Sequence, residues 1–165
     1  MAGKGKYYES QFEEATIELL RESHWQYTFG DDIHRRYTDP LIEDDLRAFL
    51  AAQYKNKELT ASEMDGIVAN LRNTSGQNDY YALQNTFLLY RDGYDFTYSD
   101  RRDNPFRLQY IDFEHPDHNI FRCVNQFVME QGRENRRPDI LLFVNGIPVC
   151  IIELKNPTKQ NATIR

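Results

Sequence analysis

Residues 137–157, RPDILLFVNGIPVCIIELKNP, organise the rest of the chain. Two apolar runs rich in β-branched residues meet at Asn145-Gly146, and an Asn-Gly pair between such runs predicts a β-hairpin. Charge within the two strands appears only toward their outer ends, as Asp139 on the first and as Glu153 and Lys155 on the second. Strands this apolar are typical of a sheet buried on both faces, where a charged side chain is costly unless it is paired or binds a metal.

The charged ends of the hairpin predict a magnesium site. Mg2+ is usually held by one or two carboxylates together with waters and substrate phosphate. Asp139 and Glu153 offer the carboxylates, and the backbone carbonyl of Leu154 offers a further oxygen. Lys155 would orient or deprotonate the attacking water, or offset charge on the phosphorus oxygens. The alternative interpretation is a hairpin whose ends reach solvent, with ordinary surface charges, and the pattern alone leaves both open.

The register of the hairpin decides whether the two carboxylates can share a metal. A strict two-residue loop at Asn145-Gly146 puts Asp139 opposite Ile152, so that Asp139 and Glu153 lie on opposite faces of the sheet. A three-residue loop closed by glycine moves them to one face. The metal site therefore predicts a positive φ at Gly146 with odd-numbered loop pairing, or else a compensating bulge near Asp139.

Hydrophobic periodicity predicts four helices before the hairpin. They run over residues 9–23, from a cap at Thr38-Asp39-Pro40, from a capping box at Thr60-Ala61-Ser62-Glu63, and over residues 78–91. Gly93 is expected to end the last of them.

A strand pattern follows the helices. Alternating apolar residues predict strands at 94–98 and 106–110, and an apolar run predicts a long strand at 120–129 that holds Gln126. The expected fold class is α/β, a mixed, mainly antiparallel central sheet flanked by helices, in a single domain of residues 1–165. Gln126 is either a satisfied polar group of the sheet or a support for the metal site.

The composition is that of a globular domain: 165 residues, 40% of them hydrophobic and 13% aromatic. No stretch approaches the roughly 18 apolar residues of a membrane-spanning helix. Residues 1–6 lead into no apolar segment, so neither export nor a membrane partner is expected. Cys123 and Cys150 lie in apolar strands, which predicts buried, reduced thiols and a cytoplasmic location.

The charged residues and the histidines predict no further catalytic site. The net charge of −6 argues against DNA binding by the whole surface and leaves two local basic patches, each of which is either a DNA contact or a solvated loop. These patches consist of Arg101, Arg102 and Arg107, and of Arg133, Arg136 and Arg137. The histidines are scattered, with no expected metal-ligand pair on a helix, at His24, His34, His115 and His118.

Two levels of pattern resemble known nucleases. Asp139, thirteen further residues and Glu153-Leu154-Lys155 resemble the D…ExK motif of the PD-(D/E)XK superfamily. The whole stretch 137–157 is similar to the N-terminal endonuclease domain of the restriction (R) subunit of type I restriction–modification enzymes. ESQFEEATIELL at 9–20 and IDFEHPDHNIFRCVNQFVME at 111–130 are similar to the same family.

The resemblance implies magnesium-dependent hydrolysis of foreign double-stranded DNA, with Asp139, Glu153 and Lys155 as catalytic residues. It also implies that an acidic residue of the first helix joins the metal site. Glu13 is the expected one, and the alternative is that Glu13 is a solvated helix carboxylate. The chain would be an N-terminal fragment, followed by a helix with a Gln-x-x-x-Tyr element and by an ATP-dependent motor. No GxxxxGK[ST] loop occurs in this sequence.

The partners implied by the resemblance are the methylation and specificity subunits of the same complex. Two alternatives stay open. One is a PD-(D/E)XK nuclease of repair or recombination. The other is a non-catalytic docking or DNA-holding module that keeps the nuclease fold.

Overall fold

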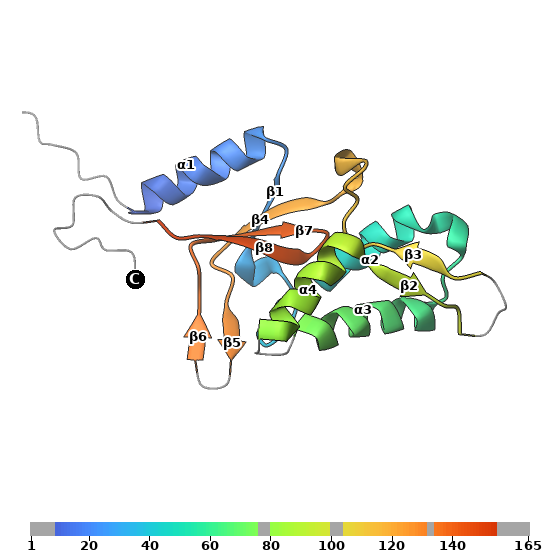
Figure 1. The fold of residues 1–165 in the computed structure, drawn as a ribbon. Coiled ribbons are helices and arrows are strands. Elements are labelled where there is room, and N and C mark those ends of the chain that lie inside the picture. Colours follow the sequence, from blue (N-terminus) through green and yellow to red (C-terminus); the bar gives the residue numbers. More distant parts are fainter. Residues whose placement is uncertain (1–8, 76–79, 100–103, 132–133, 155–165) are drawn as a thin grey trace, which may run out of the picture. The chain divides into compact units, whose positions relative to one another are not determined.

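A computed structural model describes residues 9–75, 80–99, 104–131 and 134–154. The chain divides into two compact units (Figure 1). The sheet unit consists of residues 1–40 and 121–165, and the helical unit consists of residues 41–120. The helical unit is therefore inserted into the sequence of the sheet unit.

A four-stranded sheet in the order β1-β4-β7-β8 forms the centre of the sheet unit. β1 pairs with β4 in parallel, whereas β4–β7 and β7–β8 are antiparallel. Parallel strands need a long crossover connection, and the inserted helical unit supplies it between β1 and β4. The bounds of the sheet's strands are β1 (Gln26–Phe29), β4 (Phe121–Asn125), β7 (Ile140–Val144) and β8 (Ile147–Ile152).

Helix α1 (Glu9–Glu22) lies over the sheet next to β1, and the 3-10 turn η1 (Gly30–Asp32) follows that strand (Figure 1). β5 (Met129–Gln131) and β6 (Glu134–Arg136) form a separate hairpin that projects away from the four-stranded sheet. The predicted α/β class with a mixed, mainly antiparallel sheet is thus confirmed.

The turn between β7 and β8 has two residues. Asn145 has a φ of 52° and Gly146 a φ of 74°, the left-handed pair of a type I′ turn, and Val144 pairs with Ile147. The predicted positive φ at Gly146 is confirmed. The predicted odd-numbered loop is wrong, because a type I′ turn matches the twist of the strands without a third residue.

A β-bulge in β8 changes the register instead. Phe143 pairs with Pro148 and Leu142 pairs with Cys150, so Val149 has no partner in β7. Beyond the bulge Ile140 pairs with Ile152. The compensating bulge that the metal site required is therefore present, although it lies closer to the turn than to Asp139.

β7 and β8 differ in burial. Both faces of β7 are largely buried, but β8 is an edge strand whose residues Val149, Cys150 and Ile151 are exposed. The prediction that both strands are buried on both faces is correct only for β7. For the same reason Cys123 in β4 is buried as predicted, whereas Cys150 is not.

The predicted long strand over residues 120–129 is wrong. β4 ends at Asn125 because Gln126 has a φ of 56°, a left-handed conformation that cannot continue a strand. The chain turns at Gln126 and resumes as β5. Phe127, just after the bend, is fully buried and packs against Phe143 with ring centroids 5.0 Å apart.

In the described residues of the helical unit, three α-helices accompany a small antiparallel sheet. The core of this unit includes Leu46, Leu50, Ile67, Leu71 and Tyr110, all with no exposed surface. Its elements are α2 (Glu43–Gln53), η2 (Lys55–Lys57), α3 (Ala61–Ser75), α4 (Tyr80–Asp92), β2 (Tyr94–Phe96), β3 (Phe106–Leu108) and η3 (Pro116–His118).

The helix ends test the sequence signals. The capping box is confirmed, because the Thr60 amide donates to Glu63 Oε2 at 2.9 Å and the Glu63 amide donates to Thr60 Oγ1 at 3.2 Å. Gly93 follows α4 with a φ of 67°, as expected of a helix end. The cap at Thr38-Asp39-Pro40 is wrong, because α2 begins at Glu43 after Ile42 and has no side-chain cap. In the described residues, every helix is too short or too polar to cross a membrane.

Candidate active site

Asp139 immediately precedes β7, and its side chain is held by the end of β8. The Leu154 amide donates a hydrogen bond to Asp139 Oδ2 at 2.7 Å. Since Ile140 pairs with Ile152, continuing the register by one residue puts Asp139 opposite Glu153. Directly opposed residues of antiparallel strands share a face. The bulge at Val149 therefore brings the two carboxylates to the same side of the sheet, with Asp139 half-buried and Glu153 exposed.

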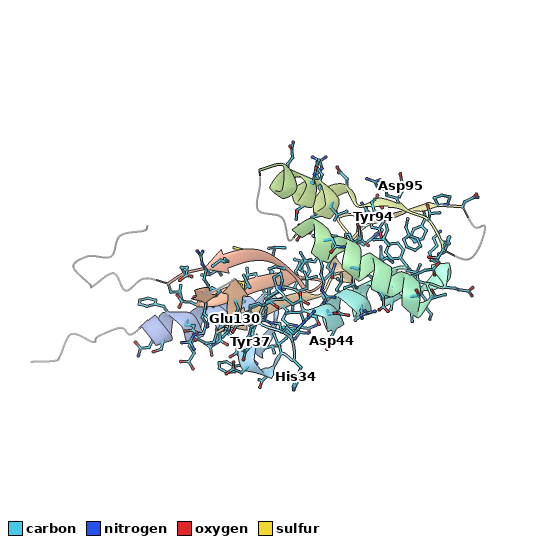
Figure 2. The ribbon with its side chains drawn as sticks, turned by 90° about the horizontal axis from the view of Figure 1, so that it is seen from below. His34, Tyr37, Asp44, Tyr94, Asp95 and Glu130 are labelled. Carbon is cyan, nitrogen blue, oxygen red and sulfur yellow. The ribbon has the colours of Figure 1, made fainter. Side chains whose placement is uncertain are left out.

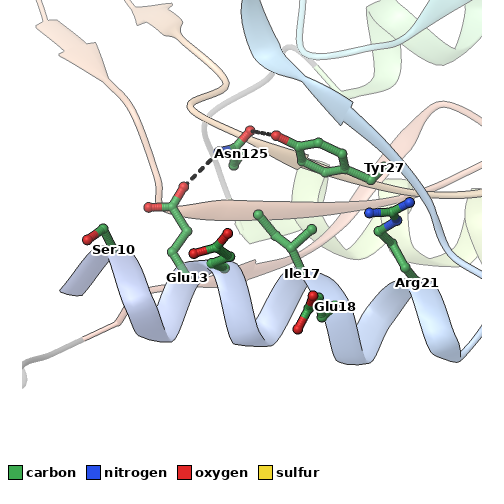
Figure 3. A pocket seen from close by; sticks show the side chains of 8 residues that line it. Ser10, Glu13, Ile17, Glu18, Arg21, Tyr27 and Asn125 are labelled. Atoms are coloured by element: carbon green, nitrogen blue, oxygen red, sulfur yellow. Dashed lines mark hydrogen bonds between the residues drawn. The ribbon is translucent and has the colours of Figure 1, made fainter. Parts of the chain in front are cut away.

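Glu13 reaches the same end of the sheet from α1. Its Oε1 accepts hydrogen bonds from Asn125 Nδ2 at 2.8 Å and from Gln126 Nε2 at 3.4 Å. Asn125 Oδ1 in turn accepts from the Tyr27 hydroxyl at 3.0 Å (Figure 3). The pKa of Tyr27 is raised, first by burial and then by the negative charge of Glu13. A network of polar side chains thus fixes the Glu13 carboxylate at the ends of β1 and β4.

Gln126 links this network to Asp139. The Gln126 amide donates to the carbonyl oxygen of Asp139 at 3.4 Å, while its side chain bonds Glu13. Asn125 pairs with Ile140 in the sheet, so the bend at Gln126 lies beside Asp139. The bend at Gln126 therefore connects the Glu13 network to the start of β7. Among the described residues, the carboxylate oxygens of Glu13, Asp139 and Glu153 do not form a group of three within 4.8 Å of one another.

A hollow of about 390 Å3 opens along α1. Its wall includes the carboxylates of Glu13, Glu14 and Glu18, with Arg21 as a cation (Figure 3). An acidic wall of this kind attracts cations and repels phosphate. Among the described residues that line the hollow, Glu13 alone belongs to the predicted metal ligands. The hollow is therefore lined by Glu13 but by neither Asp139 nor Glu153.

The bend at Gln126 is clamped by the segment that follows β1. A Cβ on Gly30 would lie 2.5 Å from the Gln126 carbonyl oxygen, so only glycine fits there. Arg35 places its guanidinium carbon 3.4 Å from the centroid of the Phe127 ring and donates to the carbonyl oxygen of Val128. Gly30 thus holds the bend through close backbone approach, and Arg35 holds it through its guanidinium group.

The segment after η1 continues this contact. The amide of Glu130 in β5 donates to the Tyr37 carbonyl oxygen at 2.9 Å, and the two residues lie close together in Figure 2. Arg35 also donates to the Asp39 carbonyl oxygen at 2.9 Å. Sequence patterns did not predict this clamp, because Gly30 begins the short 3-10 turn η1 and Arg35 lies in the irregular segment that follows it.

The predicted basic residues divide into three groups. Arg136, at the end of β6, and Arg137 are exposed just before Asp139. Arg107 belongs to the helical unit, where it donates to Asp95 at 3.2 Å and to the Asp92 carbonyl oxygen at 2.7 Å. The remaining predicted site residues lie outside the described part of the chain, namely Arg101, Arg102, Arg133 and Lys155.

The chain is similar to known proteins along nearly its whole length. A family model described as type I restriction enzyme R protein N terminus matches residues 6–165. The type I restriction enzyme HindI endonuclease subunit of Haemophilus influenzae is 28% identical over 165 residues, which cover 94% of this chain and 16% of that subunit. The putative type I restriction enzyme MjaIXP endonuclease subunit of Methanocaldococcus jannaschii is 31% identical over 169 residues, which cover 93% and 15%.

A shorter match joins them. The putative MjaVIIP endonuclease subunit of Methanocaldococcus jannaschii is 42% identical over 53 residues, which cover 32% of this chain and 5% of that subunit. The chain therefore spans about 16% of the length of the HindI subunit and about 15% of the MjaIXP subunit.

Proposed function

The chain belongs to the family of type I restriction enzyme R protein N termini, and from this premise we propose that it is the magnesium-dependent endonuclease module of a type I restriction–modification enzyme. Its reaction is the hydrolysis of phosphodiester bonds in foreign double-stranded DNA. Residues 1–165 would act as a single nuclease domain in the cytoplasm. The methylation and specificity subunits, and a motor that uses ATP, would belong to the same enzyme.

One observation carries the proposal: the bulge at Val149 corrects the register set by the two-residue turn, so that Asp139 lies opposite Glu153. A regular hairpin with this turn would separate the two carboxylates onto opposite faces. A bulge is a feature that re-aims side chains, and such features occur often beside active sites.

The donor set fits magnesium. Carboxylate oxygens from Asp139 and Glu153 and the carbonyl oxygen of Leu154 are hard ligands, and Glu13 adds a further carboxylate from α1. Because the Leu154 amide donates to Asp139 Oδ2, the orientation of this carboxylate is restrained. Bound magnesium would stabilise negative charge on the phosphate and favour ionisation of a water.

The chain's own residues supply the rest of the mechanism. Lys155 would orient the attacking water or offset the charge that gathers on the phosphorus oxygens. Asn125 and Gln126 hold the Glu13 carboxylate in a fixed direction. Arg133, Arg136 and Arg137, just ahead of Asp139, would contact DNA phosphates, with Arg101 and Arg102 as a second group.

Plasmid cleavage by the full-length complex in the presence of magnesium tests the proposal. Glu153→Ala and Lys155→Ala should each abolish cleavage, while DNA binding and ATP hydrolysis persist because other parts of the enzyme perform them. Glu130→Ala is the matched control, since Glu130 is an exposed carboxylate of the sheet unit that is not one of the predicted ligands. Full cleavage by Glu153→Ala would contradict the proposal and favour a docking or DNA-holding module.

A further inference from the structure

A second set of metal-binding groups gathers in the helical unit, in the loop after β3. Asp112, His115 and His118 place one carboxylate oxygen and two imidazole nitrogens within 4.8 Å of one another. The expectation that the histidines are scattered is therefore wrong for this pair. The prediction considered only pairs on a helix, whereas His115 precedes the 3-10 turn η3 and His118 is the last residue of that turn.

The loop holds these groups in a fixed arrangement. Asp112 Oδ1 accepts hydrogen bonds from the amides of Glu114 at 3.0 Å and His115 at 2.8 Å. Asn119 closes the loop, because its Oδ1 accepts from the Asp112 amide at 2.9 Å and its Nδ2 donates to the Asp112 carbonyl oxygen at 2.7 Å. Hydrogen bonds within the loop thus hold the backbone around the cluster in place.

Asp112 is the buried member of the cluster, with a relative exposure of 5%. Its Oδ2 accepts a hydrogen bond from Gln53 Nε2 at 3.0 Å, from helix α2. A metal ligand is commonly oriented by such an outer partner. The carboxylate therefore faces the histidines from a rigid base, and the two imidazoles lie on the solvent side.

The distances match the edges of a small coordination polyhedron. His118 Nδ1 lies 3.1 Å from Asp112 Oδ2, and His115 Nδ1 lies 3.7 Å from the same oxygen. Tetrahedral zinc with bonds of about 2.0–2.1 Å has neighbouring ligands about 3.3 Å apart. The two imidazole rings stack with centroids 5.0 Å apart and planes 17° apart, so both rings present the same edge to the carboxylate.

We propose that Asp112, His115 and His118 bind a divalent transition metal of the zinc class, at a site separate from the proposed magnesium site. Imidazole nitrogen combined with one carboxylate suits zinc, cobalt and nickel, whereas magnesium prefers oxygen ligands and water. Three protein ligands leave a fourth position, which faces solvent because both histidines are more than half exposed, at 61% and 52%. The metal would crosslink the loop that leads from β3 into β4.

Cobalt(II) is the probe, because a tetrahedral or five-coordinate Co2+ ion absorbs visible light more strongly than the hydrated ion. The full chain is titrated with Co2+ in excess Mg2+, which keeps the oxygen-rich site from taking up cobalt. The expected result is one bound Co2+ per chain and a raised midpoint of thermal unfolding, since a ligand that binds only the folded state stabilises it.

His115→Ala and His118→Ala should each weaken Co2+ binding by about tenfold or more, because even the loss of an outer partner of a ligand costs that much. Both side chains are exposed, so the variants should fold as the wild type does. His34→Ala is the matched control, an exposed histidine of the sheet unit that should leave binding unchanged.

Two outcomes would overturn the proposal. One is wild-type chain that takes up no Co2+, which would leave the cluster as a hydrogen-bonded loop. The other is uptake that His34→Ala reduces as much as His118→Ala does, which would mean adventitious binding by surface histidines.

Discussion

Asp139 has two separate roles at the scale of single residues. Its Oδ2 accepts the Leu154 amide at 2.7 Å, and its backbone carbonyl accepts the Gln126 amide at 3.4 Å. The sequence motif identified Asp139 and Glu153 because charged residues at the ends of apolar strands are rare enough to notice. It could not identify Asn125 as a partner of Glu13, because contacts between residues 112 positions apart leave no local pattern.

Asp139→Asn separates the charge of this residue from its hydrogen bond. The asparagine carbonyl oxygen can still accept the Leu154 amide, so the midpoint of urea unfolding should shift little. The variant loses one negative ligand, so Mg2+ binding measured by calorimetry should weaken markedly. In the full-length complex, plasmid cleavage should fall by about 100-fold or more, the order of effect of removing one stabilising group from a transition state.

A substitution of the same kind at another residue serves as the control. Asp117→Asn removes a charge from an exposed residue of the helical unit, and it should change neither Mg2+ binding at the hairpin nor cleavage. If Asp139→Asn binds Mg2+ as tightly as the wild type does, Asp139 is not a ligand, and its role is limited to the hydrogen bond with Leu154.

For helices and strands, periodic patterns predicted the elements that local sequence determines. They did not predict the features that tertiary contacts determine. Helix α1, the capping box of α3 and the Asn-Gly turn follow from local signals, and all three lie where the sequence puts them. The break at Gln126 does not follow, because an apolar run containing glutamine favours a continuous strand. The left-handed residue is held there by its neighbours, and only the folded chain brings them together.

Gly30→Ala tests whether the bend at Gln126 depends on the clamp. The added Cβ would lie 2.5 Å from the Gln126 carbonyl oxygen and 2.8 Å from its carbon, so backbone must move. Overpacking of this kind costs about 1–3 kcal/mol. The free energy of unfolding, measured with urea, should fall by that amount, and cleavage by the complex should fall with it because the bend carries the groups that orient Glu13.

Gly66→Ala is the control for the same substitution. Gly66 lies inside α3, and no atom would lie within 4 Å of a Cβ added there. In a helix interior, alanine is more stable than glycine by about 1 kcal/mol. This variant should be as stable as the wild type or more stable. Equal stability of Gly30→Ala and the wild type would show that Gly30 does not position the bend.

At the scale of the whole molecule, the helical unit is an insertion between β1 and β4 of the sheet unit. The sequence showed no boundary at residue 40 or 120, because neither end carries a linker composition. The positions of the histidines also predicted no cluster, whereas the loop after β3 brings two of them close to Asp112. The boundary between the units depends on long-range packing, which local patterns do not encode, whereas the cluster depends on the conformation of an irregular loop.

Charge is the property of the whole molecule that most constrains DNA binding. The chain carries a net charge of −6, and α1 adds an acidic wall beside the proposed site. Contact with a phosphate backbone must then come from local cations, and the exposed Arg136 and Arg137 precede Asp139 in sequence. A few arginines next to the carboxylates would offset the repulsion of phosphate only over a short range. Salt largely screens the interaction of exposed charges that lie more than about 8–10 Å apart.

Arg137→Ala should therefore weaken DNA binding by the full-length protein and reduce its salt dependence. Each phosphate contact contributes about 0.9 to the slope of log affinity against log salt concentration, so the slope should fall by roughly that amount. Arg91→Ala is the matched control, because Arg91 is an exposed arginine of the helical unit paired with Asp92. The measurement is DNA affinity at several salt concentrations for the three proteins. A slope that Arg137→Ala and Arg91→Ala leave equally unchanged would show that Arg137 contacts no phosphate, and the basic residues before Asp139 would then be a solvated loop.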